Sequence, residues 1–271
     1  MSLISDVIIG DLNESGKTPL IILHGGPGLG HDYLLPLNDL APEIPLVFYD
    51  QIGSGRSTHL PDRSGNEKFW CMDLFIRELD NLLACLKLQE RPIDVYGHSW
   101  GGILAASWAS RPSPSTNKLR HLVLSSSPAS MSGFRADLAT LRKQLPEEVQ
   151  AVLNRADETK DFTSSAYQAA VGVFYQRHLS LTRLWRPREV QDMQNVVTGS
   201  LRDWTCIPSL HKIKVPTLLL DGSEDTVQNE SVGPLFEHIE KVKRITLDNA
   251  GHFAHVDQRE KYMKHLRTLT S

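Results

Sequence analysis

Gly97-His98-Ser99-Trp100-Gly101 follows directly on the apolar run Ile93-Asp94-Val95-Tyr96, and a helical pattern, Ile103–Ser110, comes next. This order places a serine where a buried strand turns sharply into a helix. Strand and helix pass closely at such a turn, so the positions two residues before and after the serine must be nearly free of side chain, and both are glycine. The stretch therefore predicts that Ser99 is a nucleophile exposed at the end of a strand.

Short apolar runs recur along the chain and predict buried parallel strands. The runs are Leu20–Leu23, Leu46–Tyr49, Ile93–Tyr96, Leu122–Leu124, Thr217–Leu220 and Ile245–Leu247. Helical patterns lie between them, the clearest from Phe69 to Leu86, where apolar residues recur every three or four positions. Val232–Ile239 and Tyr262–Leu269 repeat this pattern near the C-terminal strands. The alternation predicts an α/β fold with a mostly parallel, doubly wound sheet.

The region from Ser130 to Leu210 interrupts this alternation with consecutive helical patterns. These patterns cover Phe134–Leu145, Pro146–Arg155, Ser164–Leu179 and Pro187–Val197. An insertion between two strands can cover the sheet edge where α/β proteins bind ligands. We therefore expect residues 1–129 and 211–271 to form the core and residues 130–210 to form a helical cap.

Length and charge restrict the classes of partner. The chain has 271 residues, 40% of them hydrophobic, which suits one α/β domain with an insertion. Its net charge of -3 indicates no basic surface for nucleic acid or for an anionic membrane. No apolar run approaches the roughly 20 residues of a membrane span, and the N-terminus does not resemble a signal peptide. We expect a cytoplasmic protein with a small-molecule or short-peptide substrate, in an oligomeric state that the sequence leaves open.

The cysteine pattern argues against a disulfide framework. Cys71, Cys85 and Cys206 are widely spaced and form no C-x-x-C pair, which predicts free, mostly buried thiols. His252-Phe253-Ala254-His255 has a spacing that metal ligands can use, but no partnered carboxylate motif or cysteine cluster accompanies it. No metal is therefore expected.

A serine hydroxyl needs a base within hydrogen-bond reach and a third group that orients the base. Asp225 follows the predicted strand Thr217–Leu220, and His252 follows Ile245–Leu247, at the sheet edge that carries Ser99. The order serine, acid, histidine along the chain is that of the α/β-hydrolase fold. A catalytic triad of Ser99, Asp225 and His252 is therefore predicted.

Rivals stand close to two of these residues. Asp221 and Glu224 compete with Asp225 for the role of the acid, and His255 competes with His252 for the role of the base. Asp221 ends its strand, where it suits a turn cap, and Glu224 should point away from its neighbour. The sequence favours Asp225 and His252 without excluding the others.

A glycine-rich loop, His24-Gly25-Gly26-Pro27-Gly28, follows the first buried strand. Its Gly26 amide and the Trp100 amide would together form an oxyanion hole for a tetrahedral intermediate. Binding of a phosphate or a dinucleotide is disfavoured, because the spacing matches neither G-x-G-x-x-G nor G-x-x-x-x-G-K-[ST] and Pro27 lacks an amide donor. Gly53-Ser54-Gly55 predicts a tight turn beside the site.

The motifs in this order resemble the proline iminopeptidase family of α/β-hydrolases, most of all its fungal branch. They are His24-Gly25-Gly26-Pro27-Gly28, His31-Asp32-Tyr33, Phe48-Tyr49-Asp50-Gln51, Gly97-His98-Ser99-Trp100-Gly101-Gly102 and Gly251-His252. The resemblance implies that Ser99, Asp225 and His252 act as nucleophile, acid and base, and that the Gly26 and Trp100 amides hold the oxyanion. It also implies release of an N-terminal residue, often proline, without a metal or organic cofactor.

The chain departs from the family pattern in three places. The leading edge strands look shortened or absent, and Ser180 stands where a cysteine is common. The family's asparagine-glutamate segment, whose carboxylate holds the free amino group of the substrate, is not recognisable between Trp185 and Gly199. The candidates for a substitute carboxylate are Glu158, Asp161, Glu189 and Asp192.

The expected function is cleavage of an amide or peptide bond through an acyl-enzyme, with removal of an N-terminal residue. The alternative is an esterase, a thioesterase or another α/β-hydrolase acting on a specialised metabolite, which the altered cap favours. A ligand-binding protein or a non-hydrolytic catalyst that keeps the pocket is a further alternative. Haloalkane dehalogenases and most epoxide hydrolases use an aspartate at the position of Ser99, so the serine argues against both.

Overall fold

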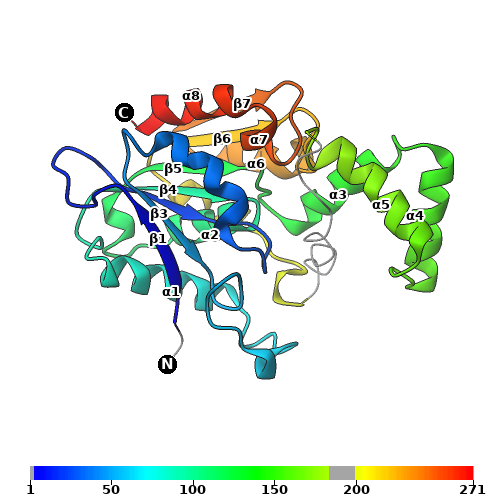
Figure 1. Ribbon diagram of the computed structural model, residues 1–271, viewed down its shortest axis with the longest axis horizontal. Coiled ribbons are helices and arrows are strands. Elements are labelled where there is room, and N and C mark those ends of the chain that lie inside the picture. The colour runs from blue at the N-terminus through cyan, green and yellow to red at the C-terminus, as the bar shows by residue number, and fades with distance from the viewer. Residues whose placement is uncertain (1–2, 183–198, 271) are drawn as a thin grey trace.

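A computed structural model describes residues 3–182 and 199–270 of the chain. Its centre is a seven-stranded sheet with the strand order β1-β3-β2-β4-β5-β6-β7 (Figure 1). Each pair of neighbouring strands is parallel except the pair β1 and β3, which is antiparallel. The strands are β1 (Ser5–Ile9), β2 (Leu20–Leu23), β3 (Leu46–Asp50), β4 (Ile93–His98), β5 (Leu119–Ser125), β6 (Thr217–Gly222) and β7 (Val242–Leu247).

Helices cover both faces of the sheet, with α8 on one side and α1 on the other (Figure 1). The helices are α1 (Met72–Cys85), α2 (Trp100–Ala109), α3 (Met131–Arg142), α4 (Glu147–Thr159), α5 (Ser165–His178), α6 (Asn229–His238), α7 (Ala254–Asp257) and α8 (Arg259–Thr270). The 3-10 segments are η1 (His31–Leu40), η2 (Pro61–Arg63), η3 (Thr116–Lys118), η6 (Gly199–Leu201) and η7 (Ile207–Lys212).

Alternation along the strands divides the core into two layers. Successive side chains of a strand point to opposite faces. Ile21 and Leu23 therefore pack with α1, α2 and α6, whereas Leu20 and Ile22 pack with η1 and α8. Strands that are buried on both faces are apolar almost throughout, which is why the sequence reveals them.

The edge strand β1 is the element that the sequence did not predict. Its residues alternate between half-buried and exposed, and Ile8 is 41% exposed. Val7 and Ile9 pack against the layer that contains η1 and α8. Only one face of β1 is covered, and its apolar residues are confined to Val7–Ile9, after the polar Ser5 and Asp6. One leading edge strand is thus present in the structure.

The segment between β5 and β6 contains α3, α4 and α5, of which α4 and α5 extend away from the sheet (Figure 1). α4 and α5 pack on each other around an apolar cluster of their own, which includes Leu153 and Tyr167. α3 instead packs along α6, and Cys206 and Leu210 belong to the main core. The predicted helix Pro187–Val197 lies outside the described residues, and the cap boundaries of 130–210 stay a prediction.

The three cysteines are free, but they are not mostly buried as expected. Cys206 is buried, Cys71 is half-buried and Cys85 is exposed. Cys85 lies beyond the apolar stripe of α1, whose buried positions include Leu79 and Leu83. Over the described ranges, no helix is long and apolar enough to cross a membrane.

Candidate active site

Ser99 lies on the turn between β4 and α2 with φ 55° and ψ -119°. A non-glycine residue in this region costs on the order of 1–3 kcal/mol, and the surrounding structure must hold it there. A side chain at Gly97 would overlap the carbonyl of Gly101, and one at Gly101 would overlap the carbonyl of Leu23. Both flanking positions therefore require glycine for the steric reason that the sequence indicated.

Asp225 and His252 form a buried pair on the loops that follow β6 and β7. His252 Nδ1 lies 2.7 Å from Asp225 Oδ1, and both side chains are almost fully buried. Burial alone would raise the pKa of Asp225, but the charge and hydrogen bond of His252 and the amide of Val227 hold it below its ordinary value. An ionised Asp225 accepts a hydrogen bond from Nδ1–H, which leaves the lone pair of Nε2 free to act as a base.

The rivals of these two residues occupy other environments. Glu224 is exposed, and Asp221 pairs with Arg244 at 3.0 Å. Burial raises the pKa of Asp221 to about 6. His255 is fully buried and its Nε2 donates to the Tyr33 carbonyl at 3.0 Å, while burial lowers its pKa to about 4. Asp225 is therefore the carboxylate that meets His252.

The glycine-rich loop after β2 lies directly against Ser99. A Cβ atom placed on Gly25 would lie 3.2 Å from the Cβ of Ser99. Within residues 3–182 and 199–270, the amides of Gly26 and Trp100 donate no hydrogen bond to a protein acceptor. Trp100 is also the first residue of α2, where the helix dipole favours negative charge. Two unpaired donors thus belong to the two segments next to Ser99.

A hydrogen-bond chain that sequence reasoning missed connects this loop to the loop of His252. The Tyr33 hydroxyl accepts from Gly25 N–H at 2.6 Å and donates to His98 Nδ1 at 3.0 Å. His98 Nε2 then donates to the carbonyl of His252 at 2.9 Å. Burial lowers the pKa of His98 well below its usual range, so the ring is neutral and can accept at Nδ1 while it donates from Nε2. In the sequence, Tyr33 belongs to the family motif His31-Asp32-Tyr33, but the motif alone indicates no role for its hydroxyl.

The end of α5 contacts both the loop that carries Asp225 and the loop that carries His252. His178 Nδ1 donates to the carbonyl of Glu224 at 2.8 Å, and its own carbonyl accepts from the His252 amide at 2.9 Å. Asp257 accepts from the amides of Gly251 at 2.9 Å and Leu181 at 3.1 Å. The inserted helices are therefore attached directly to the site.

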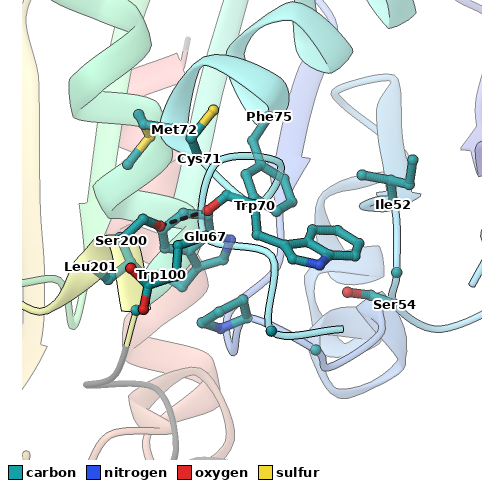
Figure 2. Close-up of a pocket in the computed structure, with 15 residues that line it drawn as sticks. Ile52, Ser54, Glu67, Trp70, Cys71, Met72, Phe75, Trp100, Ser200 and Leu201 are labelled. Atoms are coloured by element: carbon teal, nitrogen blue, oxygen red, sulfur yellow. Dashed lines mark hydrogen bonds between the residues drawn. The ribbon is translucent and has the colours of Figure 1, made fainter. Parts of the chain in front are cut away.

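A pocket of about 320 Å³ lies beside the glycine-rich loop. In Figure 2, Ile52 and Ser54 lie on one side of it and Ser200 and Leu201 on the other. Its lining is rich in aromatic and aliphatic side chains, namely Pro27, Ile52, Trp70, Met72, Phe75, Trp100 and Leu201. Glu67 is the one charged residue among the described lining residues. The lining suits an apolar group, and Glu67 offers one carboxylate to a cationic group.

Two of the carboxylates proposed from the sequence, Glu158 and Asp161, are absent from the lining of this pocket. Glu158 and Asp161 are exposed at the end of α4, where Asp161 accepts from the amide of Thr163 at 3.0 Å. Glu189 and Asp192 lie outside the described residues. In the described part of the chain, no group of three or more His, Cys, Asp or Glu side chains is placed to hold a metal ion.

The sheet and the glycine-flanked serine turn place the chain in the class of α/β-hydrolases. A family model described as "alpha/beta hydrolase fold" matches residues 18–258. The proline iminopeptidase of Saccharolobus solfataricus is 31% identical over 262 residues, which cover 90% of this chain and 82% of that protein. The proline iminopeptidase of Lactobacillus crispatus is 33% identical over 273 residues, covering 94% of this chain and 90% of that protein. The chain belongs to the proline iminopeptidase family of α/β-hydrolases and is a hydrolase.

Solved structures agree with this assignment. The crystal structure of VinJ superposes with a TM-score of 0.89 at 34% identity, covering 99% of this chain and 96% of that chain. The proline iminopeptidase of Mycobacterium smegmatis superposes with a TM-score of 0.87 at 28% identity, covering 98% of this chain and 94% of that chain. The similarity therefore extends over nearly the whole chain, including the inserted helices.

Proposed function

We propose that this chain is a serine aminopeptidase that removes an N-terminal residue from a short peptide or a small amide. The observation that carries the proposal is the 2.7 Å contact between His252 and Asp225, on loops that follow strands of the same sheet as Ser99. Relatives that are named proline iminopeptidases and cover most of the chain support the aminopeptidase activity. Assignment to the fungal branch stays a prediction from the motifs.

The proposed reaction is acyl transfer to water. His252 takes the proton of Ser99, whose oxygen attacks the carbonyl carbon, and the amides of Gly26 and Trp100 bind the resulting oxyanion. The intermediate collapses as His252 gives its proton to the leaving amine, while Asp225 stabilises the imidazolium. Water, activated by His252, then hydrolyses the acyl-enzyme and restores the serine.

The pocket supports a substrate with an apolar residue and a free amino group. Trp70, Phe75 and Trp100 offer aromatic faces, which attract both apolar groups and cations. Among the described residues, the carboxylate of Glu67 has no ion-pair or hydrogen-bond partner, so it can pair with the ammonium group of the substrate.

The free thiols fit a reducing compartment, which agrees with the expected cytoplasm.

A matched substrate panel tests the proposal. Proline, alanine and leucine arylamides with free amino groups are compared with their N-acetyl forms and with acyl esters of similar leaving group. We expect kcat/KM to be highest for free-amine arylamides. Hydrolysis of the esters alone would replace the aminopeptidase with an esterase, and turnover of neither class would favour a binding protein.

A further inference from the structure

Gln51 lies between the two segments that carry the proposed oxyanion donors. Its side-chain amide donates to the carbonyl of His24 at 3.0 Å, and its Oε1 accepts from the indole Nε1 of Trp100 at 2.7 Å. One side chain therefore bonds the loop that carries Gly26 and also the residue whose amide is the second donor. Gln51 is 1% exposed, so no water replaces these bonds without a rearrangement.

The backbone of Gln51 adds a third bond to the same loop. Its N–H donates to His24 Nε2 at 2.9 Å, while His24 Nδ1 lies 2.8 Å from the carbonyl of Gly25. A ring that donates through Nδ1 and accepts through Nε2 is neutral. Burial lowers the pKa of His24 to about 4, which keeps the ring in this state at neutral pH. His24 is therefore held by Gln51 on one side and holds Gly25 on the other.

The chain just after Gln51 is fixed from a different element. The amide of Ile52 donates to Oε1 of Glu78 in α1 at 2.7 Å, and Ile52 also lines the pocket. Gln51 is thus anchored through its own backbone, through its side chain and through its neighbour. A residue anchored in this way can fix the spacing of the segments that it joins.

We infer that Gln51 is a positioning residue of the oxyanion hole, which sets the spacing between the amides of Gly26 and Trp100. The inference rests on the proposed acyl-transfer function. Loss of one oxyanion donor costs roughly 100- to 1,000-fold in kcat in a serine protease. Loss of the residue that aligns both donors leaves them present but misplaced, so the expected loss is smaller.

Two variants remove the bonds in different ways. Gln51→Met keeps the length of the side chain and deletes both of its hydrogen bonds. Trp100→Phe deletes only the indole N–H and keeps an aromatic ring at that position. Trp108→Phe is the matched control, because it deletes an indole bond of the same helix, from Trp108 Nε1 to Asp80 at 2.9 Å, with no link to the loop.

The readouts are kcat and KM on a free-amine arylamide, Tm, and the inhibition constant of an α-aminoboronic acid that forms a tetrahedral adduct. We expect Gln51→Met to lower kcat by roughly 10- to 100-fold with KM nearly unchanged, and to weaken the boronate by a similar factor. Trp108→Phe should lower Tm comparably without moving kcat or boronate affinity. Unchanged kcat in Gln51→Met, or a change in KM alone, would overturn the inference.

A double-mutant cycle keeps the inference testable if Gln51→Met folds poorly. Trp100→Phe alone should lower kcat by roughly 3- to 10-fold, and the double variant should lose no more than Gln51→Met, because both changes break the same connection. Fully additive losses would show that the two residues act independently and would overturn the inference. If the proposed function itself is wrong, the wild type hydrolyses no arylamide, and this result is distinct from a failure of the Gln51 inference.

Discussion

At the scale of single residues, the chemistry depends on which nitrogen of His252 carries the proton. Asp225 accepts from Nδ1 at 2.7 Å, which leaves the lone pair of Nε2 available to a proton donor, Ser99 in the proposed mechanism. Asp225→Asn should reverse this tautomer and lower kcat on the order of 10⁴-fold, as the equivalent change does in trypsin-like enzymes, while the fold is kept. Steady-state kinetics with circular dichroism as the folding control measure this, and more than a tenth of wild-type kcat would exclude Asp225 as the acid.

The buried carboxyl group of Glu78 should make the free energy of unfolding depend on pH. Burial raises the pKa of Glu78 to about 7 from its ordinary 4.5, and its Oε2 lies buried without a hydrogen-bond partner in the described chain. Ionisation is easier in the unfolded chain, so this group favours folding below pH 4.5 and loses that contribution as pH rises towards 7. Glu78→Gln does not titrate, so its stability relative to wild type should rise by about 3 kcal/mol between pH 4.5 and 8. Urea unfolding at both pH values measures this, and a pH-independent difference would contradict it.

The sequence predicts individual site residues where chemistry and position coincide. Ser99, Asp225 and His252 each follow a strand end; Ser99 has a glycine two positions away on either side, and His252 directly follows Gly251. Gln51 and Tyr33 could not be assigned roles in this way, because their partners are distant in sequence. Tyr33 and His98 are 65 positions apart, and their contact depends on how η1 packs against the sheet.

At the scale of elements, the end of α5 is held by one carboxylate. Asp257 accepts from Ser180 Oγ and from the amides of Leu181, Thr182 and Gly251. Asp257→Asn turns an amide N–H₂ towards some of these donors and should destabilise the protein by roughly 1–3 kcal/mol. It should also lower kcat, because Gly251 directly precedes His252, the proposed base.

Thermal unfolding and kinetics of Asp257→Asn, compared with Asp157→Asn, test this attachment. Asp157 pairs with Arg142 on the surface of α4, and an exposed pair contributes only about 0–1 kcal/mol. Equal effects of the two variants on Tm and kcat would contradict the proposed role of Asp257.

The predictability of an element follows from its burial. β4 is buried at every position and was recognised from its apolar run, whereas β1 is covered on one face and was missed. The helices α3 to α5 were recognised from their periodicity within about three residues at most ends. Their attachment to the His252 loop could not be predicted, because it joins residues far apart in the sequence, through the carbonyls of His178 and Leu179 and through the carboxylate of Asp257.

At the scale of the whole molecule, the thiols report global unfolding. Cys85 is exposed, whereas Cys206 is buried in the main core and its pKa is raised to about 12 by burial. A thiol reagent at pH 8 should therefore modify Cys85 in the native protein and Cys206 only in denaturant. Mass spectrometry of digested samples locates the modification, and rapid native labelling of Cys206 would show that the core around it opens without unfolding.

The overall architecture is the level that the sequence predicts best. The α/β-hydrolase fold follows from the order of buried strands and from one glycine-flanked serine, and the family model that matches residues 18–258 confirms it. The pocket was not predicted, because Trp70, Trp100 and Leu201 meet there from three separate segments. Only the packed chain brings them together.

Labelling with a fluorophosphonate tests the central claim most directly, because the reagent modifies only a serine activated by a neighbouring base. Intact-mass and peptide analysis should find one adduct, on Ser99, in the wild type. Ser99→Ala should carry none, and His252→Ala should react at least 100-fold more slowly, in line with the role of a triad base. No adduct in the folded wild type, or an adduct on another serine, would contradict the assignment of Ser99 as the nucleophile.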